Sequence, residues 1–512
     1  MRHVLRPAAL VVWCLLILGL NVGKAESPNL LKDSGFESAR DGAMSSWIRP
    51  PYWQGKLTPA PSTEKPHSGR LCAELAATEK GGKWWGRAMN QSQTGITQGA
   101  RYKLSMWSRG RGRLALGCIE YGKKDGKTTY HYAPSESPPD LTNEWQEVVF
   151  HYIPQEPTAT SVAVYAEVQG EQSRALLDDA FFGLDPLPGY SMVVRPAHTM
   201  MPQGGKVAFD LRASTPSDSV ADGILIHHAA PSGVTDEKAV SLDAEKSAKY
   251  EFSADDKTET GPHTFSFVLK KAGIAETLYV DVVDPATYNA FAAAADAVRL
   301  QKPAHLIFVG DSLTALYKGY NYVDKVRGWL EQRYGPEAMV TNAGVGGDYT
   351  TRVLARLEKD VLTQSPTHVF IFLGHNDSKL KSTTDYKEAV VSPETFDKEY
   401  REIVRLIQTK TQAKVIIISA TSSVYEITKT TAEAARKAGR AHSLFGKPEA
   451  LEQFNAIAKK VAADLGGGYL DVYEPTRTHP DKKGLFTADG VHINNEGNRL
   501  VALEILKYLR GP

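Results

Sequence analysis

Two short segments, far apart in the chain, hold the side chains best suited to chemistry. Gly310-Asp311-Ser312-Leu313 follows a strand-like run, and Asp489-Gly490-Val491-His492 lies just before the last helical pattern. A serine hydroxyl is a weak nucleophile and needs a base within hydrogen-bond reach. An aspartate three residues before a histidine can hold the imidazole Nδ1–H and leave Nε2 free to take the serine proton. The sequence therefore predicts nucleophilic catalysis by Ser312, with His492 as its base and Asp489 as the partner of His492.

Residues 285–512 alternate strand-like and helical patterns, which must position these two segments. Strands flanked by helices form a parallel sheet covered on both faces, with active sites at the carboxyl ends of the strands. We therefore expect an α/β three-layer domain with a five-stranded parallel sheet. The strand-like runs are 305–309, 338–342, 368–373, 413–420 and 469–472. The helical patterns are 322–334, 350–362, 393–409, 448–465 and 495–509.

Four blocks in this region resemble the SGNH (GDSL-type) hydrolase family. Besides the two segments above, they are Asn342-Ala343-Gly344-Val345-Gly346-Gly347-Asp348 and Leu373-Gly374-His375-Asn376-Asp377. The resemblance implies an oxyanion hole made by the backbone N–H groups of Ser312 and Gly347 and the side-chain amide of Asn376. Each block alone also fits an ordinary turn or helix cap. The four together, in order and each at a strand end, favour an SGNH hydrolase domain.

The form Gly374-His375-Asn376-Asp377 is similar to that of rhamnogalacturonan acetylesterases, which implies His375 as a substrate contact. The resemblance implies a serine esterase that removes acetyl groups from a polysaccharide or oligosaccharide through an acyl-enzyme, with no cofactor for catalysis. Two alternatives stay open, because fold does not fix substrate. One is a lipid or aryl esterase of the same family, and the other is a sugar-binding or adhesion protein with an inactive hydrolase domain. We expect the loop-like segments 378–392 and 421–446 to shape the substrate cleft.

Residues 27–187 are rich in tryptophan and short strand-like runs, which favours a β-sandwich. The opening Asn29 to Glu37 and the closing Leu176 to Phe182 resemble the first and last strands of jelly-roll carbohydrate-binding modules. That resemblance implies sugar binding and a structural calcium ion in the sandwich. Exposed aromatic rings stack on the apolar faces of sugars, so the loop-like Trp53, Trp84 and Trp85 are candidate sugar contacts. Trp107 and Trp145 lie in alternating strand patterns, and we expect them in the core.

Residues 188–284 contain further strand-like runs separated by Ser, Asp and Gly turns, which suggests a small immunoglobulin-like β-sandwich. We find no chemistry in this segment and expect it to be a spacer. On that view, the hydrolase domain should work on a small ester without the residues before 286.

The first 25 residues have the pattern of a signal peptide: basic residues near the start, an apolar run from Ala8 to Leu20, and small residues before Ala25. We therefore expect a secreted or periplasmic protein that leaves the membrane once the signal is cleaved. An uncleaved anchor is the alternative. A formal net charge of +1 gives no overall field for attracting nucleic acid.

Two cysteines remain after the signal, Cys72 and Cys118, both in strand-like runs. They could form a disulfide or be buried small side chains. No cysteines and histidines have the spacing of zinc ligands, so we expect no metal site of that kind.

Overall fold

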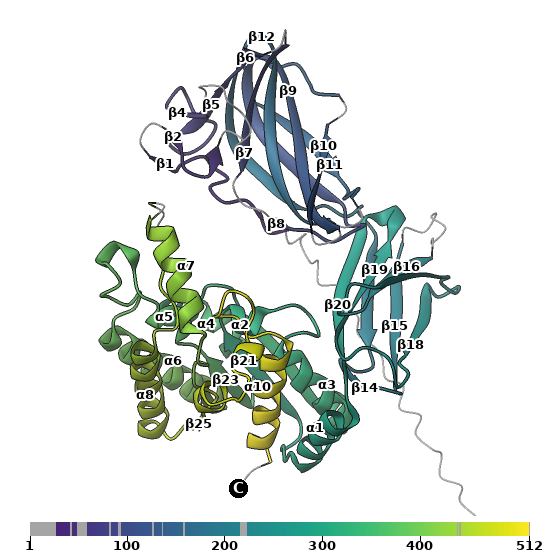
Figure 1. The fold of residues 1–512 in the computed structure, drawn as a ribbon, viewed down its shortest axis with the longest axis vertical. Coiled ribbons are helices and arrows are strands. Elements are labelled where there is room, and N and C mark those ends of the chain that lie inside the picture. Colours follow the sequence, from purple (N-terminus) through teal and green to yellow (C-terminus); the bar gives the residue numbers. More distant parts are fainter. Residues whose placement is uncertain are drawn as a thin grey trace, which may run out of the picture. The chain divides into compact units, whose positions relative to one another are not determined.

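The computed structural model describes residues 27–40, 43–48, 59–80, 83–90, 94–124, 127–135, 137–156, 159–215, 223–437, 439 and 442–510. The predicted signal peptide and Trp53 lie outside these residues. Within them, no helix is long and apolar enough to cross a membrane. The chain forms two compact units (Figure 1). The first contains the described residues up to Ile96 together with Arg101–Asp185, and the second contains Thr97–Ala100 and the chain from Pro186 onward.

The first unit is built from strands, as the sequence predicts. Two long neighbouring strands dominate it, β9 (Tyr102–Lys124) and β12 (Ala159–Leu184), and their antiparallel register shifts at bulges, one of them between Gln169 and Arg174. The other strands are β1 (Ala39–Arg40), β2 (Ala43–Met44), β3 (Trp47–Ile48), β4 (Ala60–Ser62), β5 (Cys72–Ala76), β6 (Thr78–Lys80), β7 (Lys83–Asn90), β8 (Thr94–Gly95), β10 (Lys127–Pro134) and β11 (Gln146–Tyr152). Cys72 and Cys118 are both free and buried, so they act as small apolar side chains in neighbouring parts of this unit rather than as a disulfide.

The second unit begins with a region of two sheets, residues 191–283, which we call the small β region. One sheet contains β13 (Ser191–Pro196), β15 (Lys206–Ser214) and β18 (Ser247–Ser253). The other has the order β14 (Met200–Pro202), β20 (Ile274–Val283), β19 (Gly261–Leu269), β16 (Ile224–Ala229) and β17 (Thr235–Val240). Phe209 of the first sheet packs against Phe265 and Phe267 of the second in one shared core. The immunoglobulin-like topology stays a prediction.

The five-stranded parallel sheet predicted for the C-terminal part is confirmed. Its order is β22 (Ala338–Gly344), β21 (Ala304–Gly310), β23 (His368–Phe372), β24 (Lys414–Ile418) and β25 (Gly468–Leu470), and every neighbouring pair is parallel. All seven residues of β21 are buried. A strand that is covered on both faces has a nearly continuous run of apolar residues, and this run predicts the buried strand from the sequence.

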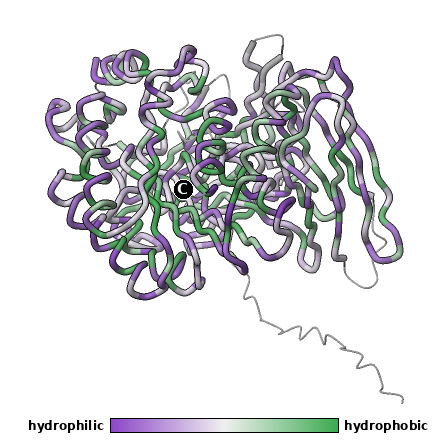
Figure 2. The backbone as a smooth tube through the Cα atoms, turned by 90° about the horizontal axis from the view of Figure 1, so that it is seen from below, coloured by the Kyte–Doolittle hydropathy of each residue, from purple (hydrophilic) through white to green (hydrophobic). Residues whose placement is uncertain are grey.

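Helices cover both faces of this sheet. Successive strand residues point to opposite faces, so Leu306 and Phe308 pack into one core and Ile307 and Val309 into the other. The first core is completed by α1 (Pro285–Ala297), α3 (Tyr322–Tyr334) and α10 (Asn495–Tyr508). The second is completed by α4 (Thr350–Asp360), α6 (Pro393–Thr411) and α8 (Pro448–Asp464). Figure 2 shows hydrophobic stretches running through this part of the chain and hydrophilic stretches on its outer turns. The remaining short helices are α2 (Ser312–Ala315), α5 (His375–Ser378) and α9 (Tyr473–Arg477).

The segment 421–446, predicted to be a loop, contains the helix α7 (Tyr425–Lys437). Its β-branched residues Thr428, Thr430 and Thr431 lower the intrinsic helix propensity, which hides the helix from a propensity-based prediction. Tertiary packing stabilises the helix instead, because Ala432 of α7 forms a small apolar cluster with Leu380 and Leu444.

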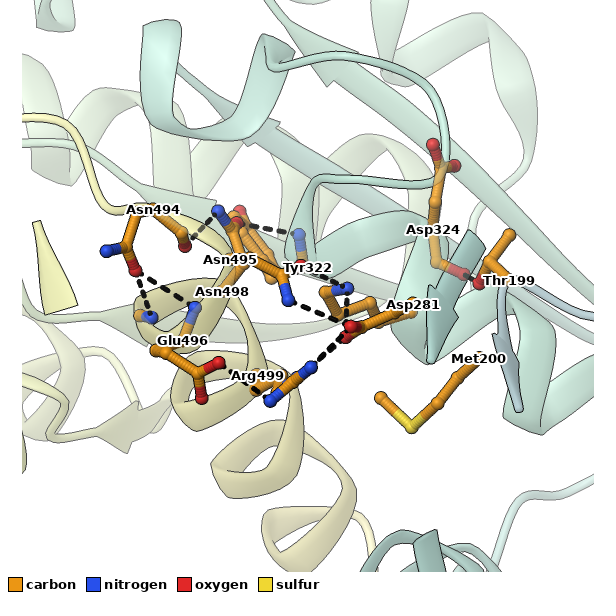
Figure 3. A network of polar contacts seen from close by, with 12 residues as sticks. Thr199, Met200, Asp281, Tyr322, Asp324, Asn494, Asn495, Glu496, Asn498 and Arg499 are labelled. Carbon is orange, nitrogen blue, oxygen red and sulfur yellow. Dashed lines mark hydrogen bonds and ion pairs between the residues drawn. The ribbon is translucent and has the colours of Figure 1, made fainter. Parts of the chain in front are cut away.

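The small β region joins the hydrolase layers through a buried carboxylate on β20 (Figure 3). Asp281 is 1% exposed and pairs with Lys325 of α3, which is 0% exposed, at 2.9 Å. It also accepts two hydrogen bonds from Arg499, of 2.7 and 2.5 Å, and one of 2.9 Å from Asn495, both on α10. Burial alone would raise the pKa of Asp281, but Lys325 and Arg499 hold it below its usual range.

A backbone contact joins β20 to the loop that follows Ser312. The Tyr279 N–H donates to the Lys318 carbonyl at 3.0 Å. The next residue, Gly319, has a φ of 80°, and a Cβ there would lie 2.1 Å from the Tyr279 carbonyl oxygen. Only glycine allows this conformation and this approach. The small β region thus contacts the loop that follows Ser312 and the helix that follows the His492 turn. Whether it is more than a spacer for activity stays a prediction.

Candidate active site

Ser312 lies at the carboxyl end of the central strand β21, as predicted. The strand ends at Gly310, and Ser312 is the first residue of the short helix α2. The Asp311 carboxylate accepts a hydrogen bond of 2.9 Å from the Leu313 N–H, which fixes the turn between strand and helix. The Ser312 side chain itself is half-buried.

His492 and Asp489 lie in the turn before α10, which hydrogen bonds hold at both ends. The Thr487 N–H donates to the His492 carbonyl at 2.8 Å, and the Val424 N–H donates to the Gly490 carbonyl at 2.8 Å. Within the turn, Asp489 Oδ1 accepts from the N–H groups of Val491 at 2.8 Å and His492 at 2.9 Å. The carboxylate therefore has a fixed direction before it meets the imidazole.

The structure brings the three predicted side chains together in one chain of hydrogen bonds. His492 Nδ1 lies 2.6 Å from Asp489 Oδ2, and His492 Nε2 lies 2.8 Å from Ser312 Oγ. A carboxylate only accepts hydrogen bonds, so Nδ1 carries the proton and Nε2 accepts from the serine hydroxyl. The arrangement can draw the hydroxyl proton toward His492.

The charges of this chain support that direction of proton transfer. The hydrogen bond to Asp489 raises the pKa of His492, against the opposing effect of burial. Burial works to raise the pKa of Asp489, but the hydrogen bonds from His492, Val491 and Thr487 hold it well below its usual range. Asp489 is therefore a carboxylate at neutral pH, and an imidazolium that forms beside it is stabilised.

Two backbone N–H groups lie free at the ends of β21 and β22. Within the described chain, the N–H groups of Ser312 and Gly347 form no hydrogen bond. Gly347 has a φ of 81°, and a Cβ there would meet nothing closer than Arg352 at 3.8 Å. Glycine is needed at this position for its left-handed conformation rather than for space. The two groups are available as donors to an oxyanion.

Asn376 follows β23 on the short helix α5 and has a defined partner at each end of its amide. Its Nδ2 donates to Asp311 Oδ2 at 3.1 Å, and its Oδ1 accepts from Lys379 Nζ at 2.9 Å. Asp311 is fully buried, and that burial raises the pKa of its carboxyl to about 7. Lys379 was missed from the sequence, because a lone lysine after a motif carries no signal of its own.

His375, predicted as a substrate contact, is only 3% exposed. Its Nε2 hydrogen-bonds with the Thr421 hydroxyl at 2.9 Å, and its ring packs edge-on against Phe372. Burial lowers the pKa of His375 to about 3, so the ring is neutral. The structure places His375 behind the site as a packing residue, which corrects the expectation of a direct contact with substrate.

The candidate sugar contacts of the first unit divide between the two faces of a strand. Trp84 and Trp85 lie in β7 rather than in a loop, and both are half-buried. Consecutive strand residues point to opposite faces. Trp85 is paired across strands with Gln169 of β12 and shares its face with Arg87. Trp84 belongs to the other face, and Trp53 lies outside the described residues.

The face of Trp85 contains a hollow of about 540 Å³. Arg87 lines it: its guanidinium pairs with Glu167 at 2.6 Å and lies 4.2 Å from the centre of the Tyr165 ring. Other residues that line the hollow are Arg113, Tyr132 and Gln169. These residues come from different strands, so no local motif could have indicated them.

Trp107 and Trp145, expected in the core, are only partly buried. Trp107 stacks on His67 with ring centres 4.0 Å apart, and Trp145 packs under the guanidinium of Arg109 at 5.2 Å. Each indole thus has a side chain of the same unit packed against it, but neither lies in the core.

Residues 308–500 match the GDSL-like lipase/acylhydrolase family. This range contains the whole candidate active site: Ser312, Gly347, Asn376, Asp489 and His492. The C-terminal domain is a GDSL-type hydrolase. It is accordingly a carboxylic ester hydrolase. Residues 28–175 match a carbohydrate-binding domain family, which agrees with the resemblance noted at the two ends of the first unit.

The GDSL-type hydrolase domain is also similar to three known proteins. A GDSL esterase/lipase of Arabidopsis thaliana is 25% identical over 221 residues, which are 40% of this chain and 85% of that protein. An acetylxylan esterase of Geobacillus stearothermophilus is 25% identical over 223 residues, which are 40% of this chain and 93% of that protein. The crystal structure of a lipase/acylhydrolase from Enterococcus faecalis has 23% identity and a TM-score of 0.33, covering 41% of this chain and 96% of that one.

The carbohydrate-binding domain was expected to hold calcium. Two carboxylates near the ends of this domain accept hydrogen bonds from the backbone. Glu37 accepts from the N–H groups of Arg70 and Leu71, and Asp178 accepts from those of His67 and Ser68. No group of three or more acidic, histidine or cysteine side chains in the described ranges could hold a metal ion. The calcium ion that the resemblance implies stays a prediction.

Proposed function

We propose that this protein is an exported esterase that removes acetyl groups from a polysaccharide or oligosaccharide. The observation that carries the proposal is the hydrogen-bonded chain from Ser312 Oγ through His492 to Asp489, at 2.8 and 2.6 Å. Export is supported by the pattern of the first 25 residues.

In the first half of the reaction, Ser312 Oγ attacks the acetyl carbonyl carbon while His492 Nε2 takes the hydroxyl proton. The carbonyl oxygen becomes negative in the tetrahedral intermediate. The free N–H groups of Ser312 and Gly347 are suited to receive it, and so is the second Nδ2 hydrogen of Asn376, since an amide has two and Asp311 takes only one. Collapse of the intermediate breaks the bond to the sugar oxygen, which takes the proton from His492.

In the second half, water hydrolyses the acetyl-Ser312 ester. His492, again neutral, takes a proton from the water as its oxygen attacks the acyl carbon. The same donors stabilise the second tetrahedral intermediate. Its collapse breaks the bond to Ser312 Oγ, which takes the proton back from His492, and acetate is released. Asp489 keeps Nδ1 protonated throughout, so Nε2 is always the nitrogen that exchanges protons with the reacting groups.

Three features support a carbohydrate as the substrate. A relative over the hydrolase domain is named an acetylxylan esterase, and the first unit matches a carbohydrate-binding domain. Tyr317, five residues after Ser312, is a 67% exposed ring held at its edge by Tyr279 and Tyr320. An exposed and positioned aromatic ring offers a stacking surface to the apolar face of a sugar.

The proposal is tested by measuring acetate release across a panel of acetylated xylans, pectins and microbial polysaccharides, beside a series of aryl esters of increasing acyl length. We expect release from at least one polymer and a preference for acetyl over longer acyl groups. Efficient cleavage of long-chain esters with no acetate released from any polymer would instead indicate a lipid or aryl esterase. No cleavage of any ester would indicate an inactive domain.

A further inference from the structure

Among the described residues, Lys379 is the one cation that hydrogen-bonds with the proposed oxyanion side chain, Asn376. Its ammonium donates to Asn376 Oδ1 at 2.9 Å, while Asn376 Nδ2 donates to Asp311 Oδ2 at 3.1 Å. The three residues thus form a second chain of hydrogen bonds beside the Ser312 chain. The proposed reaction assigns no role to Lys379.

The partners of Asn376 leave only one orientation for its amide. An ammonium only donates hydrogen bonds. If the amide were turned by half a rotation, its NH₂ would face Lys379, and the hydrogen bond of 2.9 Å between them would be lost whatever the charge of Asp311. Lys379 therefore keeps the NH₂ group on the side of Asp311, the residue that precedes Ser312.

The position of Lys379 also increases its electrostatic effect. The side chain is half-buried, and its ammonium lies 5.0 Å from the centre of the Phe445 ring. Burial lowers the pKa of Lys379, and no carboxylate of the described chain lies within ion-pair distance of its ammonium. The hydrogen-bond acceptor that its ammonium does have is the Asn376 amide oxygen. A cation at the amide oxygen draws electrons from the nitrogen and makes Nδ2–H a stronger donor.

We propose that Lys379 is a positioning residue that orients and polarises the Asn376 amide for the oxygen that becomes negative in the tetrahedral intermediate. The inference rests on the proposed function, in which Asn376 is an oxyanion donor. It assigns Lys379 an effect on the transition state only, since the ground-state carbonyl carries little charge. Loss of Lys379 should therefore lower kcat and leave KM nearly unchanged.

The test is a double-mutant cycle of Lys379→Met and Asn376→Ala, with 4-nitrophenyl acetate as a neutral substrate. Asn376→Ala should lower kcat by about a hundredfold. Lys379→Met keeps the apolar stem and should lower kcat by about tenfold in the otherwise native chain, but by less than about twofold when Asn376 is already alanine. Lys379→Gln keeps one donor without the charge, should fall between these values, and provides a second variant if Lys379→Met does not fold.

Lys381→Met is the matched control. It removes a lysine from the same segment, one that pairs with Glu388 at 3.0 Å instead of with Asn376, and it should leave kcat unchanged. An equal loss from Lys379→Met in both Asn376 backgrounds would overturn the inference, because Lys379 would then act directly or through the fold. The inference would also be overturned if Asn376→Ala lowered kcat while Lys379→Met alone left it unchanged. If Asn376→Ala alone keeps the native kcat, the proposed oxyanion role of Asn376 is itself wrong, and the inference for Lys379 falls with it.

Discussion

The Asp281 carboxylate accepts a hydrogen bond of 2.9 Å from the side-chain amide of Asn495, although 214 residues separate them in the chain. Asn495 begins α10 three residues after His492. The same carboxylate neutralises Lys325 of α3, which is fully buried. A strand of the small β region therefore anchors the helix that follows the His492 turn.

We expect Asp281→Ala to reduce the free energy of unfolding of the second unit by about 3–5 kcal/mol, the usual cost of leaving one partner of a buried ion pair alone. Adding Lys325→Met should restore part of this loss, because it removes the uncompensated charge. Denaturant unfolding measures both effects. Asp210→Ala, which breaks an exposed pair with Lys249 in the same region, is the control and should change stability by less than about 0.5 kcal/mol. Equal effects of Asp281→Ala and Asp210→Ala would mean that the buried contact is not structural.

The same contact predicts where the chain can be shortened. Residues 186–512 should keep activity on a small acetyl ester, since they contain the small β region and all the hydrolase layers. Residues 286–512 lack Asp281 and should be inactive or insoluble, because Lys325 and Arg499 lose their shared counter-ion. Purified fragments of both lengths can be compared by solubility and by ester hydrolysis. A fully active 286–512 fragment would show that the small β region is a spacer after all.

The pH dependence of hydrolysis should report His492. The imidazole must be neutral to take the Ser312 proton, and its pKa lies above the ordinary 6.5. Activity should therefore be lost as pH falls through a pKa above that value. Asp489→Asn removes the hydrogen bond that raises this pKa, so the acid limb of kcat/KM should move to lower pH while kcat falls by about tenfold or more. Asp481→Asn, in the same segment, should leave the limb in place. If Asp489→Asn did not move the acid limb, the titrating group would be one other than His492.

The two neighbouring tryptophans of β7 should differ in their effect on polymer binding. Trp85 shares its face with Arg87 beside the hollow of the first unit, and Trp84 lies on the other face. We expect Trp85→Ala and Tyr132→Ala to weaken binding to the polysaccharide substrate by about fivefold, since an aromatic contact is typically worth about 1 kcal/mol. Trp84→Ala should bind normally, and all three should hydrolyse a small ester at the native rate. Binding is measured by depletion onto the polymer. A stronger effect of Trp84→Ala would place the sugar on the opposite face.

The sequence predicted the parts of the site that short local patterns encode. The buried strand before Ser312 and the Asp489–His492 spacing each carry their information within a few residues. Asp281 and the hollow around Arg87 were missed because their partners are distant in the sequence or lie on other strands. Lys379 was missed although its partner Asn376 is only three residues away, because a lone lysine carries no signal of its own. His375 was misjudged for a related reason: a motif gives the position of a residue along the chain but not whether its side chain faces the substrate or the core.

The most direct test of the proposed reaction is the rate of acetate release by Ser312→Ala, measured on a small acetyl ester and on an acetylated polysaccharide, with thermal unfolding as the check on the fold. The Ser312 hydroxyl is the attacking group and lies 2.8 Å from His492 Nε2. We predict a loss of at least about a thousandfold on both substrates with an unchanged Tm. A folded variant that keeps about a tenth of the native rate would remove Ser312 from the reaction and contradict the proposed mechanism.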